Sequence, residues 1–336
     1  MGLGGESVCI WRAGTSAFVA CLALGAVCAS GCHSPETIAV VPQTEGTLRW
    51  EAAHVGAEEA VQGTGAFIYW NAPMRDGDVE AQIAVVDRIA SGNYKGLVLA
   101  PDQALALVTP VRRAVARGIP VVIIASPLDV PPGGNLFYVV NDDAVGGRIA
   151  AERVAEALHG SGSVAILGVD PDFAGILERV RIFESVLAAR YPHISVIEKR
   201  LGSPNAAHEQ QVAQETIDEH PHLDMIVAMN GSSIDGALSA LSSEPSSRHI
   251  LLVGFDTDNP ANIDNPHVVC IIQEDTRSMG RDAVRAILDK LDGRPVQPQT
   301  LIPPVVITRS NLNSAQVVRM WSQDWTLGRM QWSRLP

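Results

Sequence analysis

Planar polar side chains follow the apolar runs of this sequence, at the points where the runs end. Examples with amide or carboxylate groups are Asn141, Asn230, Asp256 and Gln273. Trp50 and Phe255 stand beside such positions and offer aromatic faces. Amides and carboxylates hydrogen-bond hydroxyl groups, whereas aromatic rings cover apolar C–H faces. This combination predicts a cleft for a small polyhydroxylated ligand.

The usual signatures of catalysis and of nucleotide binding do not occur. The sequence contains no phosphate-binding loop, no dinucleotide-binding glycine motif after a strand and no nucleophile-elbow motif. Residues 208–212, HEQQV, end one residue short of the zinc pattern. Residues 256–260 begin like a calcium loop, but Pro260 and Ala261 stand where a ligand and the turn glycine are needed. We therefore expect no enzymatic activity, no metal and no cofactor.

The composition narrows the class of protein further. The chain has 336 residues, enough for one large domain or two medium ones. With 25 Lys and Arg against 37 Asp and Glu its formal net charge is −12, which argues against a nucleic-acid partner. Its 46% hydrophobic and 18% charged content excludes a disordered chain.

The N-terminal segment has the layout of a secretory signal. Arg12 precedes an apolar run over 17–28, and small residues follow at 29–31, directly before Cys32. The run is too short for a confident membrane-spanning helix. Its end, Ala-Ser-Gly-Cys, resembles the lipobox of bacterial lipoproteins, which implies a signal peptide over 1–31, lipidation of Cys32 and a short tether over 32–36.

Secretion with cleavage nearby and an uncleaved anchor are the alternatives to lipidation. All three place the globular part outside the cytoplasm, in the periplasm or cell envelope. After cleavage Cys270 would be the one unmodified thiol, and we expect it to be buried in a strand.

The elements that must position the polar residues alternate between strand and helix. Apolar runs rich in β-branched residues occupy 37–41, 67–70, 96–100, 120–124, 136–140, 163–167, 194–197, 225–229, 250–253 and 268–272. Amphipathic stretches between them predict helices near 48–62, 77–91, 103–117, 143–158, 173–190, 206–219, 232–243 and 277–291. Two successive runs of such units predict two doubly wound, parallel α/β lobes. A closed eight-stranded barrel is the alternative, disfavoured because 125–136 lacks a helix.

Several stretches resemble the sugar-binding proteins of bacterial ABC importers, the ribose-binding type of the type I periplasmic-binding-protein fold. They are 119–124, 141–150, 219–230 with 236–241, and 252–256, in the order and at the spacing of that family. The resemblance covers about residues 37–309. It implies an N-terminal lobe over 37–141 plus 274–303, a C-terminal lobe over 142–273 plus 304–312, and three crossings between them. Residues 313–336 would form a C-terminal extension.

The resemblance also implies a set of ligand-binding residues. They are Thr47, Arg49 and Trp50 after the first strand, Asn141 and Gln273 at lobe crossings, Arg179 on a cleft wall, and Asn230 and Asp256 in the C-terminal lobe. Trp50 would stack on the sugar, or else pack in the core at the start of a helix. The amides and Asp256 could instead cap helices, and Arg179 could form an ion pair on a helix surface.

The sequence departs from ribose binders in four places. Ala125 and Ser126 replace an Asp-Arg pair, Leu177 stands near the place of an arginine, and no aromatic residue occurs around Pro204. Arg49 replaces an aromatic residue and adds a guanidinium group, a planar cation that can donate two parallel hydrogen bonds. Fewer carboxylates and one new arginine point away from ribose, toward another pentose or hexose, a sugar acid or another polar solute.

The function implied by the resemblance is solute capture for a membrane permease, by closure of two lobes around the ligand. The same closure could instead report the ligand to a membrane chemoreceptor or sensor kinase. A sugar-responsive transcription regulator would need an N-terminal helix-turn-helix, and a signal peptide stands there instead. We expect a monomer that contacts the membrane only through its lipid.

The tail after residue 310 lies beyond the resemblance. The helical spacing of Val317, Met320, Trp321 and Trp325 predicts an amphipathic element that packs back on the body. A contact with a partner or with the membrane surface is the alternative.

Overall fold

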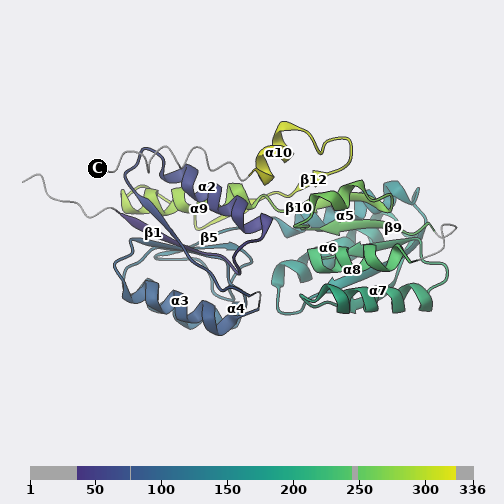
Figure 1. Ribbon diagram of the computed structural model, residues 1–336, viewed down its shortest axis with the longest axis horizontal. Coiled ribbons are helices and arrows are strands. Elements are labelled where there is room, and N and C mark those ends of the chain that lie inside the picture. The colour runs from purple at the N-terminus through teal and green to yellow at the C-terminus, as the bar shows by residue number, and fades with distance from the viewer. Residues whose placement is uncertain (1–35, 76, 244–248, 323–336) are drawn as a thin grey trace, which may run out of the picture. The chain divides into compact units, whose positions relative to one another are not determined.

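The computed structural model describes residues 36–75, 77–243 and 249–322. Within these residues the strands form two six-stranded sheets, each the centre of one lobe (Figure 1). Both lobes belong to one compact unit that begins at Thr37. The predicted pair of doubly wound α/β lobes is confirmed, and the closed barrel is wrong because both sheets are open.

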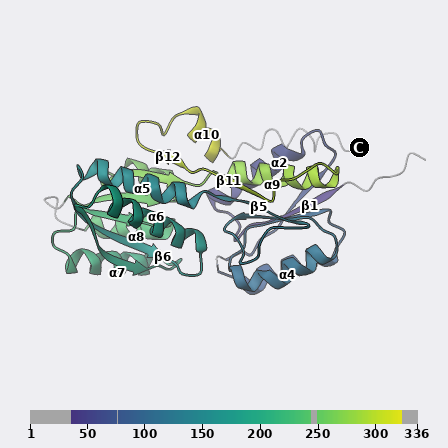
Figure 2. The ribbon, with the colours of Figure 1, turned by 180° about the vertical axis from the view of Figure 1, so that it is seen from behind.

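The sheet of the N-terminal lobe has the strand order β11-β5-β4-β3-β1-β2, and all its pairs are parallel. Its strands are β1 (Thr37–Val41), β2 (Phe67–Trp70), β3 (Gly96–Leu99), β4 (Val121–Ala125), β5 (Leu136–Asn141) and β11 (Gln299–Ile302). Helices α2 (Leu48–Val61) and α9 (Thr276–Leu291) cover one face, and α3 (Val79–Ser91) and α4 (Ala104–Ala116) the other (Figure 1 and Figure 2). Because both faces are covered, the central strands β3 and β4 are apolar and buried along their whole length.

The sheet of the C-terminal lobe has the order β12-β10-β9-β8-β6-β7, with only the β10–β12 pair antiparallel in the described residues. Its strands are β6 (Gly162–Val169), β7 (Ile194–Leu201), β8 (Met225–Ala228), β9 (Leu251–Phe255), β10 (Val268–Gln273) and β12 (Val305–Ile307). Helices α5 (Asp143–Ala157) and α6 (Ala174–Arg190) pack on one face. Helices α7 (Ala206–Glu219), α8 (Gly231–Leu241) and α10 (Ala315–Trp321) pack on the other, and η1 (Pro260–Asp264) is a short 3-10 turn.

The described chain crosses three times between the lobes: from β5 to α5, from β10 to α9 and from β11 to β12. β5 and β11 are neighbours in the first sheet, and β10 and β12 are neighbours in the second. The crossings therefore lie beside one another, and Asp142 N donates to Ile302 O at 2.9 Å between two of them.

The two short strands β11 and β12 were not predicted from the sequence. They hold four and three residues and are separated by Pro303 and Pro304, so they carry too little periodicity to be recognised. The strand predicted over 194–197 is longer in the structure, where β7 continues to Leu201. The continuation alternates exposed and half-buried residues because β7 is an edge strand, so it lacks an apolar run.

The tail forms the predicted helix, α10, and packs back on the body. Val317 and Met320 are buried against the core of the C-terminal lobe. Arg277, on α9, donates to the carbonyl oxygens of Arg319 and Ser322 at 2.8 and 2.9 Å and pairs with Glu59 of α2 at 2.6 Å. α10 therefore contacts elements of both lobes.

Cys270 is a free, buried cysteine in β10, as expected, and burial raises the pKa of its thiol to about 12. The predicted signal peptide, the lipidated Cys32 and Trp325 lie outside the described residues. None of the helices described is long and apolar enough to cross a membrane.

Two glycines let α2 and α9 pack backbone to backbone. A Cβ atom at Gly56 would lie 1.9 Å from the carbonyl oxygen of Arg277, and one at Gly280 would lie 2.1 Å from that of Ala53. Real Cβ atoms do not approach carbonyl oxygens so closely, so a methyl group at either position must push the helices apart.

We predict that Gly280→Ala lowers the free energy of unfolding by about 3 kcal/mol, because overpacking forces the backbones apart. Arg285→Ala, on the exposed side of the same helix, is the control and should change it by less than about 0.5 kcal/mol. Urea unfolding of both variants measures the difference. Equal stability of the two variants would show that the helix contact is not tight.

Candidate functional site

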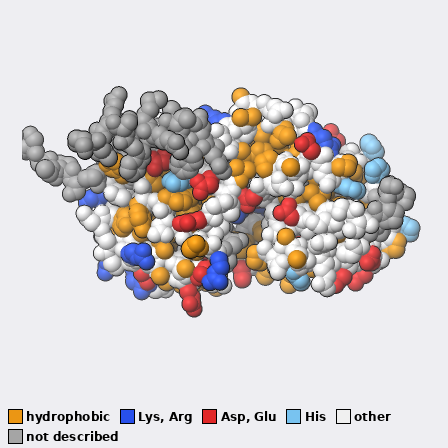
Figure 3. All heavy atoms as spheres, viewed as in Figure 1, with side chains coloured by type: hydrophobic (Ala, Val, Ile, Leu, Met, Phe, Trp, Pro, Cys, Tyr) orange, Lys and Arg blue, Asp and Glu red, His pale blue; other side chains and the backbone are white. Residues whose placement is uncertain are grey.

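A cavity of about 410 Å³ lies between the carboxyl ends of the two sheets, where open α/β sheets bind ligands. Both lobes contribute to it. Its lining includes Gln43, Arg49, Asp102, Ser126 and Asn141 from the N-terminal lobe, and Asp143, Phe173, Arg179, Asn230, Asp235, Asp256 and Asp258 from the C-terminal lobe, with Glu274 at the second crossing. Acidic side chains on the surface of both lobes are drawn in red in Figure 3.

The buried guanidinium of Arg179 organises the C-terminal wall of the cavity. Its Nε donates to Asp143 Oδ1 at 2.5 Å, its Nη1 to Asp256 Oδ2 at 2.5 Å and its Nη2 to Glu274 Oε1 at 2.7 Å. The ring of Phe255 lies under the guanidinium, 4.8 Å from its carbon. One cation is thus held by three carboxylates and one aromatic face.

The cluster carries more negative charge than its single cation balances. Burial would lower the pKa of Arg179, but Asp256, Asp143 and Glu274 together raise it above its ordinary value. Burial, and then the neighbouring charge of Asp256, raise the pKa of Glu274 from 4.5 to about 7, against the opposing effect of Arg179 and Arg49. Burial likewise raises the pKa of Asp143. Asp143 and Glu274 therefore hold protons more tightly than exposed carboxylates do.

Two residues of the cavity wall have strained backbones. Ala125, at the end of β4, has φ of 62°, and Asp256, after β9, has φ of 59°. Left-handed conformations of non-glycine residues cost of order 1–3 kcal/mol and persist where the surrounding structure fixes them. Asp256 Oδ1 accepts the backbone N–H of Glu274 at 2.8 Å, which holds it in this conformation.

Five of the eight predicted ligand-binding residues line the cavity. They are Arg49, Asn141, Arg179, Asn230 and Asp256. Asn141 donates to Glu274, so it joins the Arg179 cluster. Asn230 also caps α8: its Oδ1 accepts from Ser233 N at 2.9 Å and its Nδ2 donates to Gly168 O at 3.2 Å.

The other three lie behind the wall. Thr47 caps α2 by accepting from Trp50 N at 3.3 Å. Trp50 is fully buried in the core between α2 and the sheet, so the stacking role suggested for it does not fit its place. Gln273 is 1% exposed, and its Oε1 accepts from Thr257 N at 3.0 Å. Phe255 is buried too, and its face covers Arg179 instead of a ligand.

Of the carboxylates in the cavity, only Asp256 was assigned to the ligand from the sequence. Eight Asp and Glu residues are among its described lining, and four of them, Asp102, Asp143, Asp170 and Asp172, follow strand ends. The strand-end rule points to Asp143, two residues past the end of β5, and also to Glu274, which directly follows Gln273 at the end of β10. Asp235 stands in the second turn of α8, where that rule gives no signal.

We predict that Glu274→Gln stabilises the protein at alkaline pH. Because the pKa of Glu274 is raised to about 7 in the folded state, its favourable contribution is complete below about pH 4.5 and is lost as the pH rises through about 7. Gln keeps the size and cannot ionise. Thermal melts should show equal stability near pH 4 and an advantage of the variant of about 1–2 kcal/mol near pH 8.

Exposed Asp218→Asn is the control for this comparison and should change the stability by less than about 0.5 kcal/mol. A Glu274→Gln variant that is less stable than the wild type near pH 8 would show that Arg179 outweighs the burial of Glu274.

Comparison with known protein families gives one matching domain and several relatives. Residues 38–295 match the family described as periplasmic binding protein domain. The chain is 27% identical to the ribose import binding protein of Bacillus subtilis, over 67% of this chain and 72% of that protein. It is 22% identical to the D-allose-binding periplasmic protein of Escherichia coli, over 86% and 95%, and 29% identical to the xylitol-binding protein of Mycolicibacterium smegmatis, over 56% and 53%.

Solved structures share the fold. An ABC transporter solute binding protein from Agrobacterium vitis, bound with α-D-tagatopyranose, superposes with a TM-score of 0.77 at 25% identity, over 85% of this chain and 98% of the other. A carbohydrate transporter solute binding protein from Agrobacterium radiobacter, in complex with D-arabinose, gives 0.78 at 21%, over 86% and 100%. The resemblance seen in the sequence is confirmed by the matched domain and the shared fold. This chain belongs to the periplasmic binding protein family.

Proposed function

We propose that this protein is the extracytoplasmic solute receptor of an ABC importer and binds a monosaccharide or a similar small polar solute. The observation that carries the proposal is the cavity at the carboxyl ends of both sheets, lined by polar groups from both lobes. Its volume of about 410 Å³ lies in the range of small-molecule sites. The sugars and the polyol named for the relatives support the same class of ligand.

Binding would work through closure of the lobes. A ligand that contacts Arg49 on one lobe and Asp256 on the other gains both sets of contacts only when the lobes approach. Its differential affinity then shifts the equilibrium toward the closed form. The closed form would be recognised by the membrane permease, and the protein would release its ligand without changing it chemically.

The residues assigned to the ligand are the five that line the cavity. Asp256 and Asn141 supply acceptors for hydroxyl groups, and Arg49 supplies donors from the opposite lobe. Asn230 has its amide engaged as a helix cap, so it contributes shape and a fixed dipole. Arg179 has bonds to three carboxylates and acts mainly by holding Asp256 in place.

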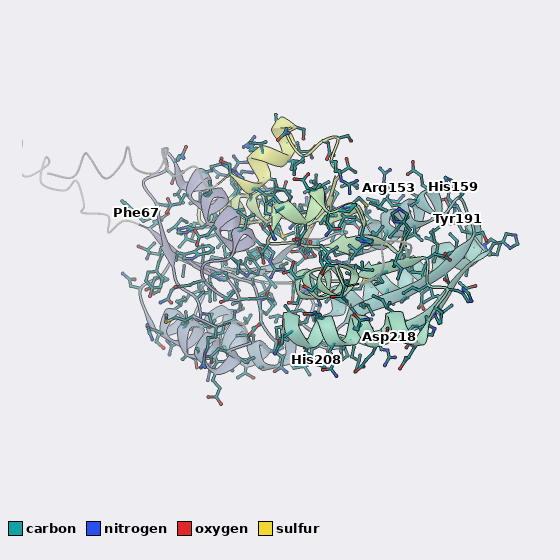
Figure 4. The ribbon with its side chains drawn as sticks, turned by 45° about the vertical axis from the view of Figure 1, so that its right-hand side comes forward. Phe67, Arg153, His159, Tyr191, His208 and Asp218 are labelled. Carbon is teal, nitrogen blue, oxygen red and sulfur yellow. The ribbon has the colours of Figure 1, made fainter. Side chains whose placement is uncertain are left out.

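We predict that a thermal-shift screen of residues 33–336 against neutral and aminated sugars and polyols finds a stabilising ligand. Asp256→Asn should remove most of the shift, because it weakens the acceptor while Asn tolerates the left-handed backbone. Asp218→Asn, on the outer helix α7 at the lower edge of Figure 4, is the control and should keep the shift. A ligand shift that survives Asp256→Asn would remove Asp256 from the site.

We also propose that the protein is a monomer, exported and held at the membrane by a lipid on Cys32. The support is the layout of residues 12–32, where a basic residue, an apolar run and small residues precede the cysteine. We predict that Cys32→Ser moves the protein from the membrane fraction to the soluble fraction of cells. Cys270→Ser is the control and should leave it in the membrane fraction. Membrane retention of the Cys32→Ser protein would indicate an uncleaved anchor instead.

A further inference from the structure

The lining of the cavity is acidic beyond what a neutral sugar requires. Its described residues include eight carboxylates against two guanidinium groups, those of Arg49 and Arg179. Some carboxylates serve the protein itself: Asp235 Oδ1 accepts from Asn262 Nδ2 at 2.8 Å, and Asp258 Oδ1 accepts from Arg49 N at 3.0 Å. These contacts hold the carboxylates in place, and both are made to neutral N–H donors.

Arg179 does not balance this charge. Its guanidinium is shared by Asp143, Asp256 and Glu274, so the buried cluster keeps a surplus of two negative charges when all three are ionised. Arg49, which lowers the pKa of Glu274, can offset only one of them. In a cleft with low-dielectric walls, such a surplus focuses a negative potential on the space in front of it. An anionic solute entering this space meets that potential, and the cavity therefore disfavours a sugar acid.

One carboxylate oxygen at this site has no hydrogen-bond partner in the described structure. The side chain of Glu274 is 8% exposed and lines the cavity, and its Oε2 lacks a partner, whereas its Oε1 accepts from Arg179 and Asn141. A buried carboxylate oxygen without a partner is costly. A donor brought by the ligand would remove this cost.

The cavity offers a ligand little aromatic surface. Phe173 is the one aromatic residue among its described lining residues, since Trp50 and Phe255 are buried behind the wall. Stacking on the apolar face of a sugar ring can therefore contribute only modestly here. Polar and charged contacts must supply most of the affinity.

We propose that the ligand is cationic, a monosaccharide or polyol that carries an amino group, with its ammonium directed at the Glu274 and Asp256 carboxylates. This inference rests on the proposed function and specifies the chemical class of its ligand. An ammonium group has three donors and no acceptor, which matches a wall of acceptors, whereas a hydroxyl group has one donor and also needs donors from the wall. Its charge offsets the surplus left by Arg179.

The test compares the affinities of matched ligands that differ in charge. Aminodeoxy sugars and 1-amino-1-deoxy alditols are paired with their parent hydroxyl compounds and with their N-acetyl derivatives, which keep the nitrogen and lose the charge. Titration calorimetry at about pH 7 should show an amino compound binding at least about tenfold more tightly than both partners. Raising the salt from about 20 to about 300 mM should weaken the amino compound more than its neutral partner.

A matched pair of variants locates the ammonium. Glu274→Gln keeps the acceptor for Arg179 and Asn141, but removes the charge and the unpartnered oxygen. It should reduce the preference for the amino compound about tenfold and change the affinity for the neutral compound much less. Asp218→Asn should leave both affinities unchanged, and thermal melts check that both variants are folded.

The outcomes separate this inference from the proposed function. Tighter binding of the parent hydroxyl compounds or of sugar acids would overturn the cationic ligand and leave sugar capture standing. A preference for the amino compound that survives Glu274→Gln would overturn the placement of the ammonium. Binding of no sugar, polyol or amino derivative would contradict both proposals.

Discussion

The contact of Arg179 with three carboxylates is the interaction on which the cavity depends. The carboxylates come from three separate segments: Asp143 from the start of α5, Asp256 from the loop after β9, and Glu274 from the second crossing. Without the guanidinium, three carboxylates would be buried against one another, and their ionised forms would strongly destabilise the fold. Arg179 therefore holds the three segments that carry these carboxylates at once. The ring of Phe255 packs under its guanidinium.

The same cluster joins the site to the connections between the lobes. Glu274 stands where the chain leaves β10 for α9, and Asn141, which donates to it, stands where the chain leaves β5 for α5. Two of the crossings thus meet in one hydrogen-bonded group at the edge of the cavity. A ligand that contacts Glu274 would therefore act on a side chain that is bonded at both crossings. Such a contact could couple ligand binding to the relative position of the lobes.

Much of the fold could be predicted because its strands are buried on both faces. Such strands appear as continuous apolar runs, and the residues after them stand at the ligand-binding edge. This rule brought Arg49, Asn141, Asn230 and Asp256 to the cavity, and the family resemblance added Arg179. It failed for β11 and β12, which are too short to show a period, and for Asp235, which enters the cavity from within a helix.

The sequence by itself determined the two lobes, the order of their elements and the edge at which a ligand binds, because these follow from the apolar pattern. Only the tertiary structure decided which of two neighbours faces the ligand. Arg49 lines the cavity while Trp50 lies in the core, because successive residues of a helix point about 100° apart. Likewise Glu274 lines the cavity while Gln273 is buried behind it at the end of β10, where successive side chains of a strand point to opposite sides. The packing of each helix or strand sets the direction in which its side chains point. That direction decides which of two neighbouring residues lines the cavity, and the sequence alone does not distinguish them.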